Sequence, residues 1–217
     1  EIVFHRVPDV GVLTNLMFLV SVAAIAAIGG YTLGQQRRAA YLRRVLLERA
    51  VESSQHTALH DMLTGLPNRR LFLERLSHAV ARDTRFGRHA AVLFLDLDGF
   101  KNVNDRYGHA AGDRFLQVVA QRLSDCVRET DTVARFGGDE FVVLLEDLAN
   151  GSEVFEALER IDASLAEPVE FGGHALTVSA SIGAALHPRD AKTPEDLLRA
   201  ADEGMYRTKT QRRRMSM

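Results

Sequence analysis

TVARFGGDEFVVLL, residues 132–145, contains two short apolar segments separated by two glycines and two acidic residues. Both segments, 132–136 and 141–145, are rich in the β-branched and aromatic residues that favour strands. Paired glycines adopt the positive φ angles of a tight turn at little cost, so residues 137–140 predict a hairpin between the two strands. The sheet of this protein should therefore include at least one antiparallel pair.

Helices and strands alternate on both sides of the hairpin. Ala90 to Asp96 is short, continuous and apolar, which predicts a fully buried strand. Further strands are expected at 169–171 and 176–186, and helices at 70–82, 112–127 and 154–165. A last helix should begin at Pro194, because Thr193 is a suitable N-cap residue. The fold class is α/β, a mixed sheet with helices on its faces.

The N-terminal part has a different composition. No charged residue occurs from Val10 to Gln36, and a helix of about 20 apolar residues can span a bilayer. A buried core helix is the alternative. A cleaved signal peptide fits less well, because it has a shorter apolar core and carries its basic residues before that core. Here Arg37, Arg38, Arg43 and Arg44 follow it, which by the positive-inside rule places the rest of the chain in the cytoplasm.

These features predict four segments. Residues 1–9 form an extracytoplasmic stub, 10–36 a transmembrane helix in the bacterial inner membrane, 37–59 a connector helix, and 60–217 a cytoplasmic catalytic domain. The connector fits either a short coiled coil between two chains or a solvated helix. The chain begins at Glu1 rather than Met, so we expect it to be part of a longer protein, with an upstream sensor.

Overall composition excludes several classes of site. The formal net charge of -2 and a pI near 6.5 lack the basic excess of a nucleic-acid-binding protein, so no nucleic-acid partner is expected. The single cysteine, Cys126, excludes an intramolecular disulfide and a thiolate zinc cluster. Phosphate binding, if present, must be local.

Acidic residues gather at two places that a sheet can bring together. Asp96 and Asp98 end the buried strand, and Asp139 and Glu140 lie in the hairpin. If these strands are neighbours, three or four carboxylates converge at one edge, an arrangement that suits magnesium together with substrate phosphates. Salt bridges to Arg135 or Lys101 would account for the same carboxylates without a metal.

Several segments occur in the order found in one family. They are residues 61–69 (DMLTGLPNR), 96–105 (DLDGFKNVND), 107–113 (YGHAAGD), 135–141 (RFGGDEF), 181–183 (SIG) and 201–209 (ADEGMYRTK). Together they resemble the GGDEF family of diguanylate cyclases over about residues 61–213. The resemblance implies a five-stranded mixed sheet flanked by helices, similar to nucleotidyl cyclases and the polymerase palm. It also implies an enzyme that joins two GTP molecules into cyclic di-GMP and releases pyrophosphate.

The resemblance also implies roles for the acidic residues. Asp96 and Asp139 would hold Mg²⁺, or Mn²⁺, through their carboxylates, and Leu97 would do so through its backbone carbonyl. Asp139 would also accept the proton of the ribose 3'-hydroxyl, and Glu140 would complete the acidic cluster. Gly137 and Gly138 would let the backbone approach the phosphates.

A second group would bind the nucleotide. Asn104 and Asp113 resemble the guanine-recognising pair, with His109 beside them; taken alone, Asn104 fits a turn and Asp113 a helix N-terminus. Lys101, Lys209 and Arg213 would meet the triphosphate. Arg213 departs from the family pattern, because Arg212-Arg213-Arg214 stands where a Gly-Arg-Asn is usual, and this run also fits a solvated basic tail.

The resemblance extends to regulation and assembly. Arg128 and Asp131 form an Arg-x-x-Asp at the position of the family's product-inhibition site; in isolation the pattern is a common surface ion pair. Each domain would bind one GTP, so the enzyme would act as a homodimer. The alternatives are a non-catalytic receptor for GTP or cyclic di-GMP, or a structural linker, both disfavoured by the intact acidic hairpin.

Overall fold

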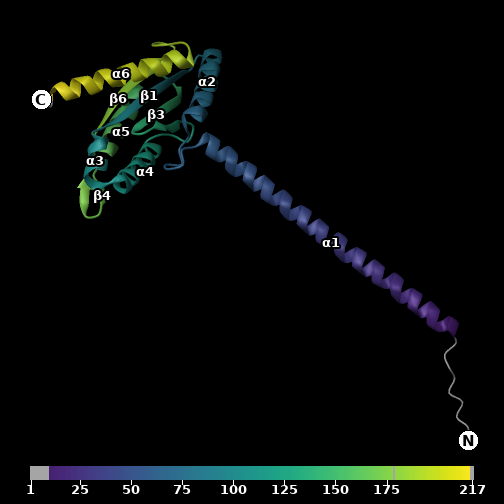
Figure 1. The fold of residues 1–217 in the computed structure, drawn as a ribbon. Helices are drawn as coiled ribbons and strands as arrows, with labels where there is room; N and C mark the ends of the chain where they lie inside the picture. Colours follow the sequence, from purple (N-terminus) through teal and green to yellow (C-terminus); the bar gives the residue numbers. More distant parts are fainter. Residues whose placement is uncertain (1–9, 178, 216–217) are drawn as a thin grey trace, which may run out of the picture. The chain divides into compact units, whose positions relative to one another are not determined.

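The computed structural model describes residues 10–177 and 179–215, apart from a number of side chains, so the predicted stub at residues 1–9 lies outside the described residues. The chain divides into two compact units, Glu1–Gln55 and His56–Met217, which are described separately. Helix α1, Val10–Leu59, accounts for the described part of the first unit (Figure 1).

Helix α1 contains the predicted transmembrane segment. Residues Gly11–Tyr31 have a mean hydropathy of 2.2, and none of their apolar window is buried. By length and composition this segment can cross a membrane, although a soluble core helix or a signal sequence meets the same criterion. The side chains of residues 45–56 lie outside the described part of the chain, so a coiled coil in the connector stays a prediction.

The second unit is built on a four-stranded sheet with the order β2-β3-β1-β6. All three neighbouring pairs are antiparallel. Its strands are β1 (His89–Asp98), β2 (Thr132–Gly137), β3 (Glu140–Leu148) and β6 (Ser179–His187). Strands β4 (Val169–Phe171) and β5 (His174–Leu176) pair only with each other.

The prediction of a five-stranded mixed sheet is therefore wrong in strand number and strand direction for the described residues. The physical reason lies in the helical crossovers. The connections from β1 to β2 and from β3 to β6 leave the two strands of each pair parallel. In the sheet, however, a strand of the other pair lies between them. Interleaving two such crossovers gives a sheet whose neighbours are all antiparallel.

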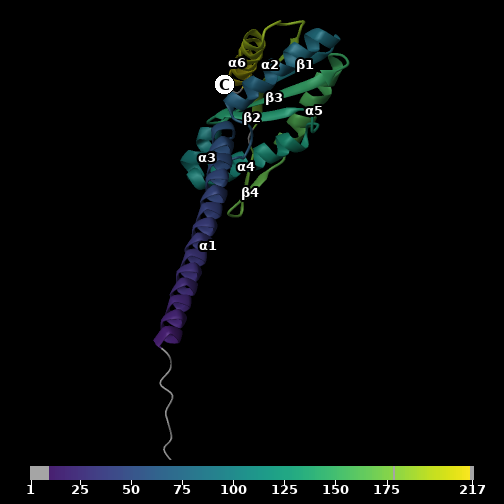
Figure 2. The same cartoon turned by 90° about the vertical axis from the view of Figure 1, so that its right-hand side faces the viewer.

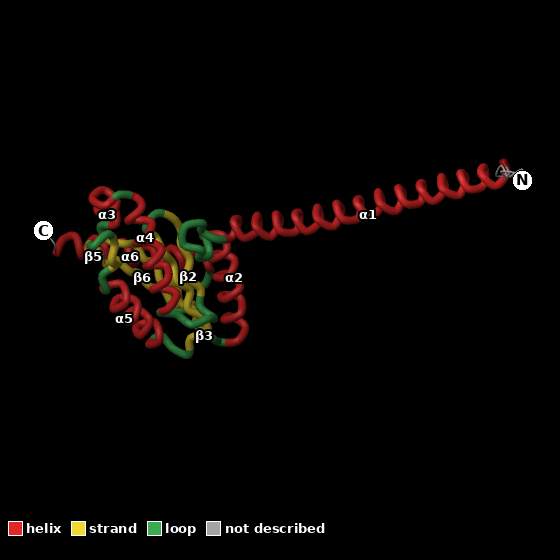
Figure 3. Tube along the Cα trace, turned by 90° about the horizontal axis from the view of Figure 1, so that it is seen from below, coloured by secondary structure: helices red, strands yellow, loops and turns green. Residues whose placement is uncertain are grey.

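Helices cover both faces of this sheet (Figures 2 and 3). They are α2 (Arg69–Phe86), α3 (Phe100–Tyr107), α4 (His109–Asp125), α5 (Ser152–Ala166) and α6 (Pro194–Met215). Helix α3 is absent from the sequence-based expectation, because it is short and Gly108 separates it from α4. Helix α2 begins where the Asn68 side chain accepts bonds from the backbone N–H groups of Arg70 and Leu71, at 3.0 and 3.2 Å.

Strand β1 confirms the prediction of a fully buried strand. Its odd-numbered residues, such as Leu93 and Leu95, pack against α3, α4 and α5, whereas Val92 and Phe94 face α2 and α6. Successive side chains of a strand point to opposite faces, and both faces of β1 are covered by helices. Every residue from Ala90 to Leu95 is therefore buried and apolar, and the first polar residue of this run is Asp96.

Helix α6 lies directly on the backbone of β6. A Cβ atom added at Gly183 would stand 2.0 Å from the Met205 nitrogen and 2.1 Å from the Ala201 oxygen. On the helix side, a Cβ atom at Gly204 would lie 3.3 Å from the Gly183 Cα. Two glycines therefore set the distance between the last helix and the sheet.

Helix α2 carries a buried acidic side chain, Asp83, near the ends of β1 and β6 that lie farthest from Asp96. Asp83 of α2 is 1% exposed, and neither of its carboxylate oxygens has a hydrogen-bond partner among the described residues. The nearest cation candidate is the buried His187, whose Nδ1 is 3.9 Å from Asp83 Oδ2. Burial raises the pKa of Asp83, and Asp147 raises it further, although His187, Arg82 and His89 act in the opposite direction.

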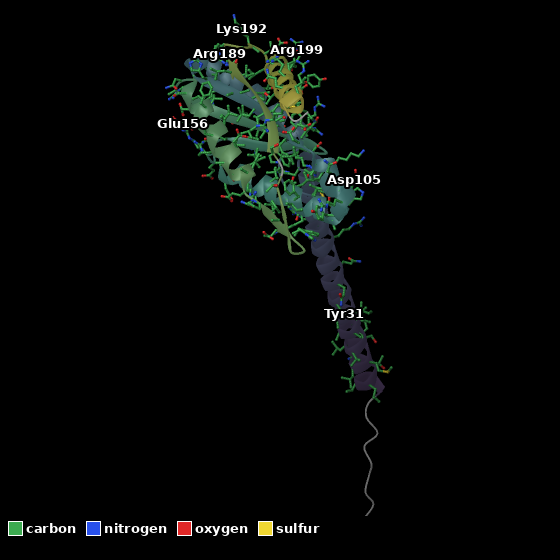
Figure 4. The ribbon with its side chains drawn as sticks, turned by 90° about the vertical axis from the view of Figure 1, so that its left-hand side faces the viewer. Tyr31, Asp105, Glu156, Arg189, Lys192 and Arg199 are labelled. Carbon is green, nitrogen blue, oxygen red and sulfur yellow. The ribbon has the colours of Figure 1, made fainter. Side chains whose placement is uncertain are left out.

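Replacing Asp83 with Asn should stabilise the domain at pH 7. The folded state binds the Asp83 proton more tightly than the unfolded chain does, so this residue makes stability rise as the pH falls from neutral through the raised pKa. Asp83→Asn should raise the Tm at pH 7, by about 2–4 °C for each kcal/mol of folding free energy gained. It should also remove the increase in stability that wild type shows as the pH falls. Thermal unfolding from pH 4 to 8 measures both, with Asp105→Asn, an exposed residue (Figure 4), as the control. A lower Tm for Asp83→Asn at pH 7 contradicts the prediction.

Candidate active site

Strands β1 and β3 bring the predicted acidic residues together. Asp96 stands opposite Glu140 in the antiparallel register. The backbone N–H of Leu97 donates to the Asp139 carbonyl at 3.2 Å. The side chain of Asp96 is nearly buried, and those of Asp139 and Glu140 are half-buried. Two carboxylates from adjacent strands and one from the β2–β3 turn thus lie at the same end of these strands.

These carboxylates repel one another. Burial raises the pKa of Asp139, and the negative charge of Asp96 adds to the effect. Burial also raises the pKa of Glu140, together with the charges of Asp96, Asp139 and Asp202. A divalent cation would stabilise the ionised forms, and carboxylate oxygens are the ligands that Mg²⁺ prefers. Among the described residues no group of three or more His, Cys, Asp or Glu side chains is placed to hold a metal ion alone, so the residues present fit an ion that Asp96 and Asp139 share with substrate phosphates.

A lysine from α6 is the nearest positive charge. Lys209 Nζ is 2.6 Å from Asp96 Oδ1. Of the two residues considered as salt-bridge partners from the sequence, Arg135 pairs with Asp61, although its charge also lowers the pKa of Asp139, and the side chain of Lys101 is exposed. Lys209 is therefore placed to meet anionic groups that approach Asp96.

Arg135 holds the turn that presents Asp139. Its Nε and Nη2 donate to the Gly138 carbonyl at 3.1 and 2.8 Å. Its Nη1 donates to Asp61 Oδ1 at 2.9 Å. Burial would raise the pKa of Asp61, but hydrogen bonds from Thr64 and Arg135 lower it, so the carboxylate stays charged. The guanidinium thus joins residue 61 to the hairpin.

Replacing Arg135 with Lys should reduce activity more than stability. A lysine keeps the charge but cannot bond the Gly138 carbonyl and Asp61 at the same time in this fork geometry. We expect a roughly tenfold lower rate of product formation from GTP and a Tm within a few degrees of wild type. Arg88→Lys, at an exposed arginine outside the predicted site, is the matched control for rate. Equal loss of rate in both variants would argue against a positioning role for Arg135.

Asp98 is not part of the carboxylate cluster. It accepts hydrogen bonds from the hydroxyls of Ser179 and Ser181, at 3.1 and 2.8 Å. It also accepts one at 3.2 Å from Arg212, which donates to the Ala180 carbonyl as well. The sequence argument missed Arg212, although its position three residues after Lys209 places both on one face of α6. The side chain of Arg213 lies outside the described residues.

The predicted guanine-binding residues lie where α3 meets α4. Asn104 is half-buried near the end of α3, and its carbonyl accepts the Gly108 N–H at 2.9 Å. His109 and Asp113 are exposed on the first turns of α4. This places an amide, an imidazole and a carboxylate on two helices that are joined through a single residue.

A cavity of about 420 Å³ adjoins Glu140 on the face of the sheet that α2 and α6 cover. Its apolar lining includes Phe94 and Phe136, and Arg69 lies over the Phe136 ring at 5.5 Å from the centroid. The remaining lining residues come from α2 and α6 and are Leu73, Glu195, Leu198, Arg199 and Asp202. The charged groups of this cavity lie beside the catalytic hairpin.

The structure brings Arg128 and Asp131 into one turn. The Arg128 backbone N–H donates to Asp131 Oδ2 at 2.9 Å, whereas its guanidinium donates to Glu153 at 3.0 Å. The other oxygen of Asp131 accepts the Glu146 N–H of β3 at 3.0 Å. The exposed guanidinium of Arg128 is therefore available to a ligand at the cost of one surface ion pair.

Comparison with known proteins matches this region. Residues 58–215 match the family described as "Diguanylate cyclase, GGDEF domain". The diguanylate cyclase TpbB of Pseudomonas aeruginosa is 47% identical over 159 residues, which are 73% of this chain and 37% of TpbB. The chain thus spans little more than a third of that relative's length.

Solved structures agree with the family match. The GGDEF domain of TpbB aligns with a TM-score of 0.69 and 47% identity, covering 70% of this chain and 89% of that one. The GGDEF domain of DgcB from Caulobacter crescentus, in complex with c-di-GMP, aligns with a TM-score of 0.66 and 28% identity, covering 71% and 89%. With its sheet, its acidic hairpin and its sequence in agreement, this chain belongs to the GGDEF diguanylate cyclase family.

Proposed function

We propose that this chain condenses two GTP molecules into cyclic di-GMP and pyrophosphate. One observation carries the proposal: Asp96 at the end of β1, Glu140 at the start of β3 and Asp139 in the turn before β3 lie at the same end of these neighbouring strands, and the pKa values of Asp139 and Glu140 are raised. Carboxylates held together in this way are typical of sites that bind metal ions and move protons.

Asp139 acts as the general base. The ribose 3'-oxygen of one GTP attacks the α-phosphorus of the other, a phosphodiester bond forms, the α–β phosphoanhydride bond breaks, and pyrophosphate leaves with the electron pair. The same step in the opposite direction closes the ring, so two phosphodiester bonds form and two pyrophosphates leave. Asp139 takes the proton of the hydroxyl, and its raised pKa improves it as an acceptor. Asp96, Asp139 and the Leu97 carbonyl would hold Mg²⁺ or Mn²⁺. This ion would neutralise the triphosphate and lower the pKa of the hydroxyl.

The remaining predicted residues bind the nucleotide. Lys101, Lys209 and Arg213 meet the triphosphate, and Gly137 and Gly138 allow the backbone to approach it. A separate group recognises the base: the Asp113 carboxylate accepts hydrogen bonds from the N1 and N2 hydrogens of guanine, the Asn104 amide bonds the same base, and His109 lies beside them. Adenine leaves these polar groups unpaired, which selects against ATP.

Each domain binds one GTP, so the reaction requires two domains. Two copies must face each other for each 3'-hydroxyl to reach the other nucleotide, so the active form is a homodimer. Helix α1 anchors the chain in the bacterial inner membrane with the catalytic domain in the cytoplasm, and it raises the effective concentration of the paired domains. Cyclic di-GMP inhibits by binding at Arg128 and Asp131.

The test uses the full chain in detergent micelles, freed of bound nucleotide. With GTP and Mg²⁺ it should form cyclic di-GMP, at a rate per chain that rises with protein concentration and stops when EDTA is added; chromatography of the nucleotides measures each. A dimeric sample that binds GTP or cyclic di-GMP but makes no product would favour the receptor function instead.

A further inference from the structure

Gly112 of α4 lies against the side chain of Asn104. A Cβ atom added at Gly112 would stand 1.9 Å from Asn104 Oδ1 and 2.9 Å from its Cγ, with the Phe100 ring 3.1 Å away. Gly112 is buried within a regular helix, so its backbone conformation is one that any residue adopts. While the Asn104 carboxamide keeps this position, a Cβ atom does not fit at position 112.

We propose that Gly112 is a specificity-determining position, because its lack of a side chain leaves the space, here called the seat, that the Asn104 carboxamide occupies. In this position the amide of Asn104 and the carboxylate of the adjacent Asp113 bind the same guanine. This inference rests on the proposed function, because it assigns a role within the nucleotide site. Gly112 touches no substrate and acts through Asn104.

Helix propensity supports this assignment. Glycine is a poorer helix former than alanine, and the two residues before Gly112 are Ala110 and Ala111. An alanine at 112 would favour α4 by propensity alone. The glycine thus weakens the helix locally, and the contact with Asn104 is the feature of the site that explains it.

The connection between the helices prevents an easy adjustment. Helix α3 ends at Tyr107 and α4 begins at His109, with only Gly108 between them. The Asn104 carbonyl accepts the N–H of Gly108, and the Gly108 carbonyl accepts the N–H of Gly112 at 3.3 Å. A Cβ atom at 112 cannot push α4 away without breaking this link, so the carboxamide of Asn104 must rotate out of its place.

The experiment compares Gly112→Ala, Asn104→Ala and the double variant. Calorimetry with GTP and with ATP, each with Mg²⁺, measures affinity, and thermal unfolding measures stability. Gly112→Ala should weaken GTP binding about tenfold, leave ATP binding unchanged and lower the Tm. The double variant should bind GTP no worse than Asn104→Ala and should recover the Tm of that variant, because the group that the new methyl meets is gone.

Gly151→Ala is the matched control. Its new Cβ atom would meet only Leu186 Cδ2, at an ordinary 3.5 Å, so it should bind GTP as wild type does. Wild-type GTP affinity in Gly112→Ala would overturn the proposal. A double variant that melts as low as Gly112→Ala would also overturn it, because the glycine would then serve the Phe100 contact.

These outcomes separate the inference from the proposed function. Wild-type protein that binds GTP with the expected pattern across the variants, yet makes no cyclic di-GMP, supports the seat and refutes the cyclase. Synthesis by wild type with no effect of Gly112→Ala refutes only the seat. Wild-type protein that binds no GTP refutes both.

Discussion

Asp139→Asn should lower the rate of cyclic di-GMP formation about a thousandfold or more, because in the proposed mechanism Asp139 is both the proton acceptor and a metal ligand. The same variant should be at least as stable as wild type at pH 7. Burial and Asp96 raise the pKa of Asp139, so the ionised carboxylate costs folding free energy at neutral pH. Asparagine removes that charge, and the gain in stability should shrink as the pH falls towards the raised pKa.

Steady-state rates and thermal unfolding at pH 7 and 5 measure these two effects. Asp162→Asn, at an exposed position on α5, should change neither. A variant that keeps more than about a tenth of the wild-type rate would exclude Asp139 as the base. A large drop in its Tm would show that Asp139 has a structural role instead.

Gly183→Ala should strongly destabilise the domain. Its Cβ atom would lie about 2 Å from two backbone atoms of α6, which cannot rotate away as a side chain can. The helix must therefore separate from β6, and both lose buried apolar contacts. We expect a loss of more than about 4 kcal/mol, or a Tm lower by about 10 °C.

Gly204→Ala provides a graded control on the opposite side of the same contact. Its Cβ atom would approach the Gly183 Cα to 3.3 Å, a distance that a small shift can accommodate, and alanine favours the helix. Soluble expression and circular dichroism melting should place it near wild type. Similar melting of Gly183→Ala and wild type would mean that α6 does not lie on β6 as described.

The sequence predicted the parts of the fold that depend on local pattern. The apolar run of β1, the hairpin of β2 and β3, and the capped start of α6 all have short-range signals, and they are present. The mixed sheet was predicted incorrectly: the hairpin pair is antiparallel as expected, but so are the other two neighbouring pairs. Strand order depends on which crossover spans which strand, and no local pattern encodes that choice.

The candidate site also combines features that the sequence predicted with contacts that it did not. Carboxylates at strand ends were predictable, because β1 and β3 only had to be neighbours. The partners of those groups were not. Lys209 reaches Asp96, and Arg212 reaches Asp98, from a helix more than a hundred residues later in the chain. Contacts of this kind are set by the docking of α6 through Gly183 and Gly204.

The late position of Lys209 has a consequence for synthesis of the protein. Asp96, Asp139 and Glu140 all emerge from the ribosome before α6 does. If β1 and β3 pair before α6 docks, the three carboxylates come together without the Lys209 ammonium group. Pairing of these two strands is then electrostatically less favourable than in the finished domain, and docking of α6 completes the carboxylate site as well as the hydrophobic core.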